Sequence, residues 1–195
     1  MLEVGVLAIQ GDFAEHIAVL GELGVTAREI RLPEQLHSLD GLIIPGGEST
    51  TLSRLMTIYN LRDPIAEMAA QGHAIWGTCA GMIMLSQEIT EQDPVPLGIM
   101  DIGVQRNAFG RQVDSFEQAL NVDGIGEDPY HAIFIRAPVI IRVGPAVRVL
   151  SKLEDQRPVA VQQGNLIATS FHPELTRDYR FHSYFLNLAN RNTPS

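Results

Sequence analysis

Short apolar runs alternate with amphipathic segments through the first half of this chain of 195 residues. Residues 4–9 are apolar except for Gly5, as is typical of a strand that is buried on both faces. Residues 12–23 carry apolar side chains at helical spacing, with Asp12 placed to cap a helix and Gly24 placed to end it. This alternation of strand and helix predicts a parallel sheet with helices on both faces.

The same patterns place the remaining elements. Further strands are expected at residues 25–30, 41–44 and 74–76, and helices at residues 50–59, 64–70 and 80–88. The second half changes to shorter segments, with strands expected at residues 115–122, 132–135, 147–150, 159–163 and 166–170. Gln163-Gly164-Asn165 indicates a hairpin between the last two strands, and a final helix is expected over residues 176–190.

Right-handed crossovers make an α/β fold of the flavodoxin-like type, with a doubly wound and mostly parallel sheet, the expected topology. Ligands of such sheets bind beyond the carboxyl ends of the strands. The loop at residues 45–49 and the turn at residues 77–81 both follow predicted strands, so both are expected at that edge. Since neither a repeat nor a linker interrupts the pattern, one domain over residues 1–195 is predicted.

The composition argues against several classes of function. A net charge of −9 at pH 7 argues against binding to nucleic acid or to an anionic membrane, because both require a basic surface. The sequence lacks an apolar stretch of roughly 18 residues and a basic N-terminal segment, so neither a membrane span nor a signal peptide is expected. With Cys79 as the single cysteine, no disulfide can form within the chain, and a cytoplasmic location is expected.

Gly77-Thr78-Cys79-Ala80-Gly81 joins a predicted strand to a predicted helix. A glycine two residues away on each side is the pattern of a nucleophile elbow, with cysteine in place of serine. Such a turn projects the side chain into a cleft, and the N-terminus of the following helix favours a thiolate. The same free N–H groups can stabilise an oxyanion. A buried structural cysteine is the alternative, since that is the commoner role of a lone cysteine.

Ser170-Phe171-His172-Pro173-Glu174 ends the last predicted strand. Residues two apart in an extended chain project to the same side, so Glu174 can approach the imidazole of His172. A carboxylate on one ring nitrogen selects the tautomer whose other nitrogen accepts the thiol proton. A surface turn with an incidental histidine and glutamate is the alternative. A metal site of Cys79, His172 and Glu174 would lack the close Cys or His partner common in zinc sites, so no metal is predicted.

Together these residues resemble the class I (triad) glutamine amidotransferases, and within them the glutaminase subunits of pyridoxal 5'-phosphate synthases. The motifs that carry the narrower resemblance run from near the N-terminus to the final helix. They are Leu7-Ala8-Ile9-Gln10-Gly11, Glu15-His16, Pro45-Gly46-Gly47-Glu48-Ser49-Thr50-Thr51, Gly77-Thr78-Cys79-Ala80-Gly81, Arg106-Asn107-Ala108-Phe109-Gly110-Arg111-Gln112-Val113-Asp114-Ser115-Phe116, Phe134-Ile135-Arg136-Ala137-Pro138 and Ser170-Phe171-His172-Pro173-Glu174-Leu175-Thr176. No catalytic position departs from the pattern of that family.

The resemblance implies a domain of the class I glutamine amidotransferase type that hydrolyses L-glutamine through Cys79, His172 and Glu174. It also implies that the ammonia passes to a separate synthase subunit, which assembles pyridoxal phosphate from a pentose phosphate and a triose phosphate. In the family the two subunits form a large hetero-oligomer, and the glutaminase is nearly idle alone. No cofactor is expected on the glutaminase.

By the same resemblance, the substrate is expected to contact Gly47, Glu48, Ser49, Arg106, Ile135 and Arg136. The backbone N–H groups of Gly47 and Ala80 are expected to form the oxyanion hole, since Ala80 follows the nucleophile and Gly47 lies in a glycine loop at a neighbouring strand end. An arginine fork suits a carboxylate, which gives Arg106 an independent rationale, with a surface ion pair as the alternative. Glu48 and Ser49 could instead cap the helix that begins near residue 50.

Three other functions share part of this pattern. A triad glutaminase serving a different biosynthetic synthase would have the same catalytic residues, and a cysteine hydrolase of this fold would act on peptides or esters instead. A flavodoxin-like binding module would need a glycine-rich phosphate loop after the first strand, where Gln10-Gly11-Asp12 places an acid. Four histidines are expected to be surface or packing residues, and His16, near the strand-end edge, is a candidate for contact with the partner. The four are His37, His73, His131 and His182.

Overall fold

The computed structural model describes residues 2–106 and 115–190, so residues 107–114 of the motif that begins at Arg106 lie outside the described residues. Seven strands form a central sheet. Their order is β10 (Arg148–Lys152), β11 (Pro158–Gln163), β12 (Leu166–Thr169), β4 (Ala74–Thr78), β3 (Gly41–Ile44), β1 (Glu3–Leu7) and β2 (Thr26–Ile30). Pairing is parallel from β12 to β2 and antiparallel where β11 meets β10 and β12. The expected α/β fold with a mostly parallel sheet is confirmed.

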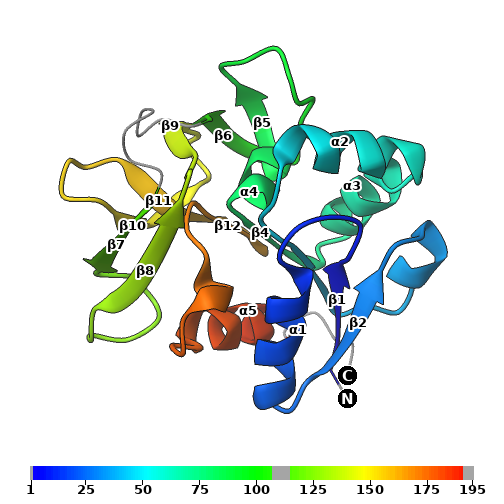
Figure 1. Ribbon diagram of the computed structural model, residues 1–195, viewed down its shortest axis with the longest axis horizontal. Helices are drawn as coiled ribbons and strands as arrows, with labels where there is room; N and C mark the ends of the chain where they lie inside the picture. The colour runs from blue at the N-terminus through cyan, green and yellow to red at the C-terminus, as the bar shows by residue number, and fades with distance from the viewer. Residues whose placement is uncertain (1, 107–114, 191–195) are drawn as a thin grey trace.

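Helices cover both faces of this sheet (Figure 1). One face carries α1 (Phe13–Glu22) and α5 (Arg180–Asn190), and the other carries α2 (Ser49–Ile58), α3 (Arg62–Ala70) and α4 (Ala80–Leu85). Strand β3 contributes to a hydrophobic core on each face of the sheet. Ile43 packs in the core on the side of α1 and α5, whereas Leu42 and Ile44 pack in the core on the side of α2, α3 and α4. Among the helices of the described ranges, none combines the length and the apolar character needed to cross a membrane.

Two smaller sheets flank the central one. Strands β5 (Ser86–Ile89), β6 (Met100–Gln105) and β9 (Val139–Val143) form one, and β7 (Ser115–Leu120) pairs with β8 (Tyr130–Ile135) in the other. Short 3₁₀ turns occur at η1 (Pro33–Leu36) and η2 (Pro173–Leu175). The predicted hairpin is confirmed, since β11 and β12 are antiparallel neighbours on either side of Gly164.

Two predicted helices have an end that lies more than two residues from its predicted position. The helix expected at residues 80–88 ends at Leu85, because Ser86 leaves the helical conformation and residues 86–89 pair with β6 as a strand. The helix expected from residue 176 begins at Arg180, after η2 and a turn in which Asp178 accepts a hydrogen bond from the Arg180 backbone. Tertiary pairing and local capping, which periodicity does not report, set both boundaries.

The parallel arrangement positions the site. Strands β1, β3, β4 and β12 run in one direction, so their carboxyl ends meet at a single edge of the sheet. The loops that leave these four ends contain Asp12, Gly47, Cys79 and His172, respectively. The expectation that the loop at residues 45–49 and the turn at residues 77–81 share this edge is confirmed.

Candidate active site

Cys79 occupies the turn between β4 and α4 with φ 49° and ψ −105°. Residues with a side chain rarely adopt such angles, and the strain persists only where the surrounding structure holds it. Neighbouring glycines permit the turn: a Cβ on Gly81 would lie 1.9 Å from the carbonyl oxygen of Ile44, and a Cβ on Gly77 would lie 2.5 Å from Gly81. The strand–turn–helix geometry of a nucleophile elbow is therefore present, and Cys79 is only 7% exposed.

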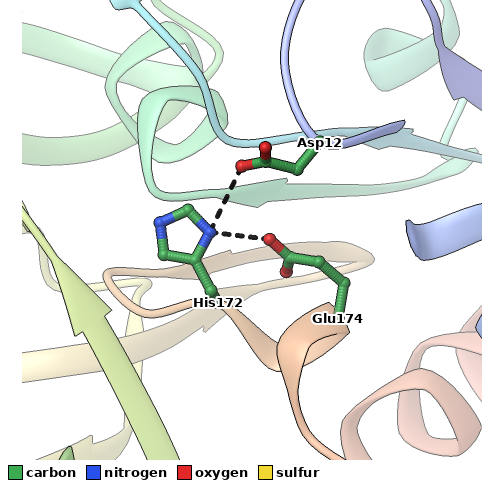
Figure 2. A group of neighbouring side chains, drawn as sticks. All are labelled: Asp12, His172 and Glu174. Carbon is green, nitrogen blue, oxygen red and sulfur yellow. Dashed lines mark hydrogen bonds and ion pairs between the residues drawn. The ribbon is translucent and has the colours of Figure 1, made fainter. Parts of the chain in front are cut away.

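His172 follows β12, the strand next to β4 in the sheet. Its Nδ1 lies 2.6 Å from Oε1 of Glu174 (Figure 2). The backbone N–H of His172 donates to the carbonyl of Ile133 at 2.8 Å, which ties this turn to β8. Both His172 and Glu174 are buried, so the imidazole is held by a carboxylate that solvent does not reach.

Opposed electrostatic effects act on this pair. Burial alone would lower the pKa of His172, but hydrogen bonds to Cys79 and Glu174, together with their charges, raise it to about 10. Burial raises the pKa of Glu174 above its usual value, against the lowering effect of the hydrogen bond from His172. The imidazole therefore holds a proton readily, while the carboxylate depends on its neighbours to remain ionised. Environments of this kind are typical of catalytic acid–base groups.

A second carboxylate, that of Asp12, faces the same imidazole nitrogen, with Oδ2 3.5 Å from Nδ1 of His172 (Figure 2). Asp12 stands at the N-cap position of α1, but its side chain makes no capping hydrogen bond within the described residues. Asp12, His172 and Glu174 are the described residues whose ligand atoms lie close enough together to hold a metal ion. Because Nδ1 is already bonded to Glu174, the arrangement favours orientation of the imidazole over metal binding.

A cavity of about 430 Å³ opens at the carboxyl edge of the sheet, within the size range of small-molecule sites. Cys79 and His172 line it, while Glu174 lies outside the lining, behind the imidazole. The structure also brings the other predicted site residues to this cavity, although their roles stay predictions. They are Gly47, Glu48, Ser49, Ala80, Arg106, Ile135 and Arg136.

Glu48 caps α2, which is the alternative role that the sequence offered for this residue. Its carboxylate accepts hydrogen bonds from the backbone N–H groups of Thr50 at 2.9 Å and Thr51 at 2.7 Å. Burial would raise the pKa of Glu48, but these hydrogen bonds lower it to about 2. Nη2 of Arg106 lies 3.5 Å from the same carboxylate, and Nη1 donates to the carbonyl of Asp93 at 2.8 Å. Arg106 is thus held at the rim of the cavity, beside the Glu48 carboxylate that already caps α2.

The glycine loop at residues 46–47 packs directly on the imidazole. A Cβ on Gly46 would lie 2.6 Å from Cε1 of His172. The Gly46 carbonyl accepts a hydrogen bond from the backbone N–H of Asp12 at 3.0 Å, which fixes the peptide that carries the Gly47 N–H. Only glycine leaves room for this approach between loop and base.

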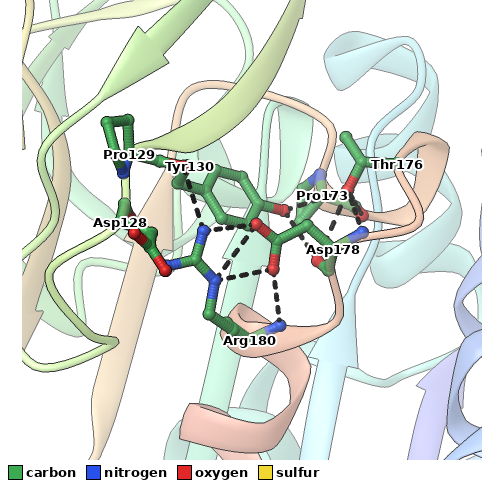
Figure 3. Close-up of polar contacts among 7 residues, drawn as sticks. All are labelled: Asp128, Pro129, Tyr130, Pro173, Thr176, Asp178 and Arg180. Carbon is green, nitrogen blue, oxygen red and sulfur yellow. Dashed lines mark hydrogen bonds and ion pairs between the residues drawn. The ribbon is translucent and has the colours of Figure 1, made fainter.

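A polar network fixes the 3₁₀ turn η2 from the far side (Figure 3). The guanidinium of Arg180 donates to the carbonyl of Asp128 at 2.7 Å and pairs with the carboxylate of Asp178. The Tyr130 hydroxyl lies 3.3 Å from Oγ1 of Thr176 and donates to the Asp178 carbonyl at 3.3 Å. These bonds tie the backbone that follows η2 to β8 and to the start of α5.

His16 is completely buried, so the expectation that it faces a partner is wrong. Its Nε2 lies 3.3 Å from Oε2 of Glu174, and its Nδ1 lies 3.0 Å from Nε2 of His182. The sequence carried no signal for this cluster, because its members come from α1, η2 and α5. By contrast, His37 and His131 are exposed, as expected of surface residues.

The sequence model of the SNO glutamine amidotransferase family matches residues 6–191. The chain belongs to this family. A relative from Herpetosiphon aurantiacus, named pyridoxal 5'-phosphate synthase subunit PdxT, is 57% identical over 190 residues, which cover 96% of this chain and 100% of the relative. A relative of the same name from Moorella thermoacetica is 53% identical and covers 96% of this chain and 99% of its own length.

Solved structures agree with this family assignment. A crystal structure of a glutamine amidotransferase matches with a TM-score of 0.91 and 50% sequence identity, covering 96% of this chain and 98% of that one. A glutamine amidotransferase from Thermotoga maritima matches with a TM-score of 0.65 and 12% identity, covering 99% of this chain and 86% of that one. At that identity the second match shows the fold alone, which is the expected class I glutamine amidotransferase fold.

Proposed function

We propose that this chain is the glutaminase subunit of a pyridoxal 5'-phosphate synthase and hydrolyses L-glutamine to L-glutamate and ammonia. The observation that supports this most directly is the cavity that Cys79 and His172 share, with Glu174 bonded to the far nitrogen of the imidazole. The names and high identity of the relatives support the same activity. The single-domain organisation over residues 1–195 and the cytoplasmic location belong to this proposal.

In the proposed reaction the Cys79 sulfur attacks the side-chain amide carbon of glutamine, and a γ-glutamyl thioester forms. His172 holds the proton given up by the thiol and passes it to the departing ammonia. Its raised pKa, about 10, suits it to carry that proton at neutral pH. Glu174 keeps the imidazole oriented, and water then hydrolyses the thioester to release glutamate.

The proposed oxyanion donors are the backbone N–H groups of Gly47 and Ala80, each donor being worth about 3 kcal/mol in other hydrolases. The charged α-groups of glutamine are assigned to the residues around the cavity rim, with Arg106 binding the α-carboxylate through its guanidinium. The other proposed contacts are Glu48, Ser49, Ile135 and Arg136. Since the Glu48 carboxylate already caps α2, main-chain atoms of this loop are the better candidates for substrate contact.

The ammonia is proposed to pass to a synthase subunit within a large hetero-oligomer. The relatives are named as subunits of pyridoxal 5'-phosphate synthase, which supports a partner of that kind. A triad glutaminase serving another synthase remains the alternative, and the identity of the activating partner distinguishes the two.

The test is ammonia release from glutamine, measured with and without the pyridoxal 5'-phosphate synthase subunit from the same source. We expect ammonia from the mixture, and none from a mixture containing Cys79→Ala or from one given asparagine. Ammonia release by Cys79→Ala would refute the nucleophile. A wild-type protein that stays inactive with this synthase subunit and is activated by another would establish the alternative.

A further inference from the structure

The Glu174 carboxylate, which lies behind the His172 imidazole, is the first member of a row of buried polar side chains on the face of the sheet covered by α1 and α5. Oε2 of Glu174 lies 3.3 Å from Nε2 of His16, and the same nitrogen lies 3.3 Å from Oγ1 of Thr78. Nδ1 of His16 lies 3.0 Å from Nε2 of His182. His16, Thr78 and His182 are 0% exposed, so the row runs inward from the base and is sealed from solvent.

Burial favours the neutral form of both histidines of the row. Burial lowers the pKa of His16 well below its usual value, with the charge of His172 acting in the same direction, and burial lowers the pKa of His182 to about 3. Trp76 packs edge-on against both rings, with centroids 5.7 Å and 4.9 Å away. A neutral imidazole has one N–H group and one bare nitrogen, so only a few arrangements of protons are available.

The contacts select one arrangement. If His16 carried its proton on Nδ1, its bare Nε2 would face the Glu174 carboxylate, and lone pairs would oppose each other. The proton of His182 would then lie on Nδ1, a buried atom without a hydrogen-bond partner in the described residues. In the opposite arrangement, Nε2–H of His182 donates to Nδ1 of His16, and Nε2–H of His16 donates to Oγ1 of Thr78. Oε2 of Glu174, which makes no hydrogen bond within the described residues, lies 3.3 Å from the same His16 nitrogen. The second arrangement removes the opposed lone pairs, and at Nδ1 of His182 it leaves a bare nitrogen in place of a buried N–H donor without a partner in the described residues.

The arrangement of protons matters because a second carboxylate, that of Asp12, also lies near the His172 imidazole. Nδ1 of His172 faces Glu174 at 2.6 Å and Asp12 at 3.5 Å, so the imidazole has two carboxylates within reach (Figure 2). We propose that His16, with its tautomer set by His182, is a positioning residue that holds the Glu174 carboxylate on the catalytic imidazole. This inference rests on the proposed glutaminase function. No proton leaves His16, since the role requires only that its N–H group stay beside Oε2 of Glu174.

The positioning contact also determines how readily Glu174 takes up a proton. Among the described residues, the titratable groups that face Glu174 are His172, Asp12, His16 and Tyr130. An N–H group beside a buried carboxylate favours its ionised form. Loss of that donor should therefore move the acid limb of kcat/KM to higher pH, a change that general damage to packing would not produce.

Two polar substitutions separate the contacts of His16. His16→Gln places an amide N–H near the position of Nε2 and keeps an N–H group beside Glu174 and Thr78, while His16→Asn reaches only the position of Nδ1 and the contact with His182. Phe185→Leu, on α5 and equally buried, controls for disturbed packing on this face. Each variant is assayed for ammonia release in the assembled complex with the synthase subunit, across a range of pH.

We expect His16→Asn to lower kcat about 10- to 100-fold, leave KM for glutamine unchanged and raise the acid limb by about one pH unit. His16→Gln should stay within about threefold of the wild type, and Phe185→Leu should keep the wild-type pH profile. Equal losses in the two His16 variants with an unmoved acid limb would assign His16 a structural role only. Full activity in His16→Asn would overturn the proposal as well.

The tautomers give a readout that does not depend on turnover. Nitrogen-15 imidazole spectra of the wild-type chain should show His16 and His182 protonated at Nε2, with His16→Gln and His182→Gln assigning the signals. Protonation of His16 at Nδ1 would overturn the inference even in an active enzyme. A wild-type complex that releases no ammonia would instead refute the proposed function, so the two failures are distinguishable.

Discussion

Among single residues, Cys79 carries the clearest backbone strain, because φ of 49° with ψ of −105° suits glycine and few other residues. Strain of this kind costs about 1–3 kcal/mol and is retained where function requires it. We therefore expect Cys79→Gly to be more stable to urea than Cys79→Ala by about 1–2 kcal/mol, the reverse of the usual order. Urea unfolding followed by the fluorescence of Trp76, the single tryptophan, measures the difference.

The control for this prediction is Ala18, an exposed residue in the interior of α1. There glycine should be the less stable residue by about 0.5–1 kcal/mol, because it loses more conformational freedom on folding. If Cys79→Gly is also less stable than Cys79→Ala, the turn does not store the strain inferred from its angles.

Arg106 gives the second prediction at this scale. A guanidinium that binds the α-carboxylate of glutamine should contribute about 1.5–3 kcal/mol, so Arg106→Ala should raise KM roughly 10- to 100-fold and change kcat little. Arg148→Ala, which removes an exposed arginine paired with Asp123 away from the cavity, is the matched control. An unchanged KM for Arg106→Ala, with a raised KM for Arg136→Ala, would transfer the role to Arg136.

Residues of the candidate site differ in how far the sequence could predict them. Cys79, His172 and Glu174 were predictable because each lies in a short motif whose local geometry implies a chemistry. His16 and Asp12 were not, since their relation to the imidazole arises where α1 packs against η2. A helix period places His16 on the buried face, but it does not reveal which side chain that face meets.

Among the elements, the contact of α4 with β3 is the tightest requirement around the elbow, and Gly81 supplies it. A Cβ there would lie 1.9 Å from a backbone oxygen of β3, so Gly81→Ala should destabilise the fold by about 3 kcal/mol. Gly21 is the matched control, because it is also a helical glycine and a Cβ there would meet nothing within 4 Å. Gly21→Ala should stabilise by about 0.5–1 kcal/mol in the same urea titration. Equal effects of the two changes would contradict the packing account.

The elements with strong periodicity were predictable, and those that depend on distant pairing were not. Strand β3 was predicted with its observed bounds, because an apolar run between turn signals admits few alternatives. Strands β6 and β9 were not predicted, and β5 was assigned to the end of a helix. Residues 86–89 are a strand through their pairing with residues 100–104, which lie beyond any local window.

At the scale of the whole molecule, the two faces of the sheet have different electrical character near the site. The face covered by α2, α3 and α4 packs apolar side chains, while the face covered by α1 and α5 also encloses His16, His182 and Glu174. Buried ionisable groups couple the free energy of unfolding to pH. The free energy of unfolding should therefore depend on pH in the acid range through histidines that are buried in the folded chain.

The direction of that response follows from the pKa shifts. His16 and His182 have pKa values lowered from 6.5, His182 to about 3, so below pH 6.5 the unfolded chain binds protons that the folded chain does not. Their contribution is full above pH 6.5 and falls as the pH drops, by up to about 1.4 kcal/mol per pH unit for each histidine. His172 acts oppositely: with its pKa raised to about 10, its contribution is full below pH 6.5 and is lost as the pH rises toward 10.

Stability should consequently be greatest near neutral pH and decline on both sides. In urea titrations between pH 4 and 9, His182→Gln should flatten the acid decline by the slope of one histidine, about 1.4 kcal/mol per pH unit at most, and leave the alkaline decline unchanged. Replacing His37, whose side chain is exposed, by glutamine is the matched control for the change of histidine to glutamine. The carboxylates that also titrate in acid are common to all three proteins and cancel in the comparison. An acid slope in His182→Gln equal to that of the wild type would mean that folding does not lower the pKa of His182, and it would contradict this account.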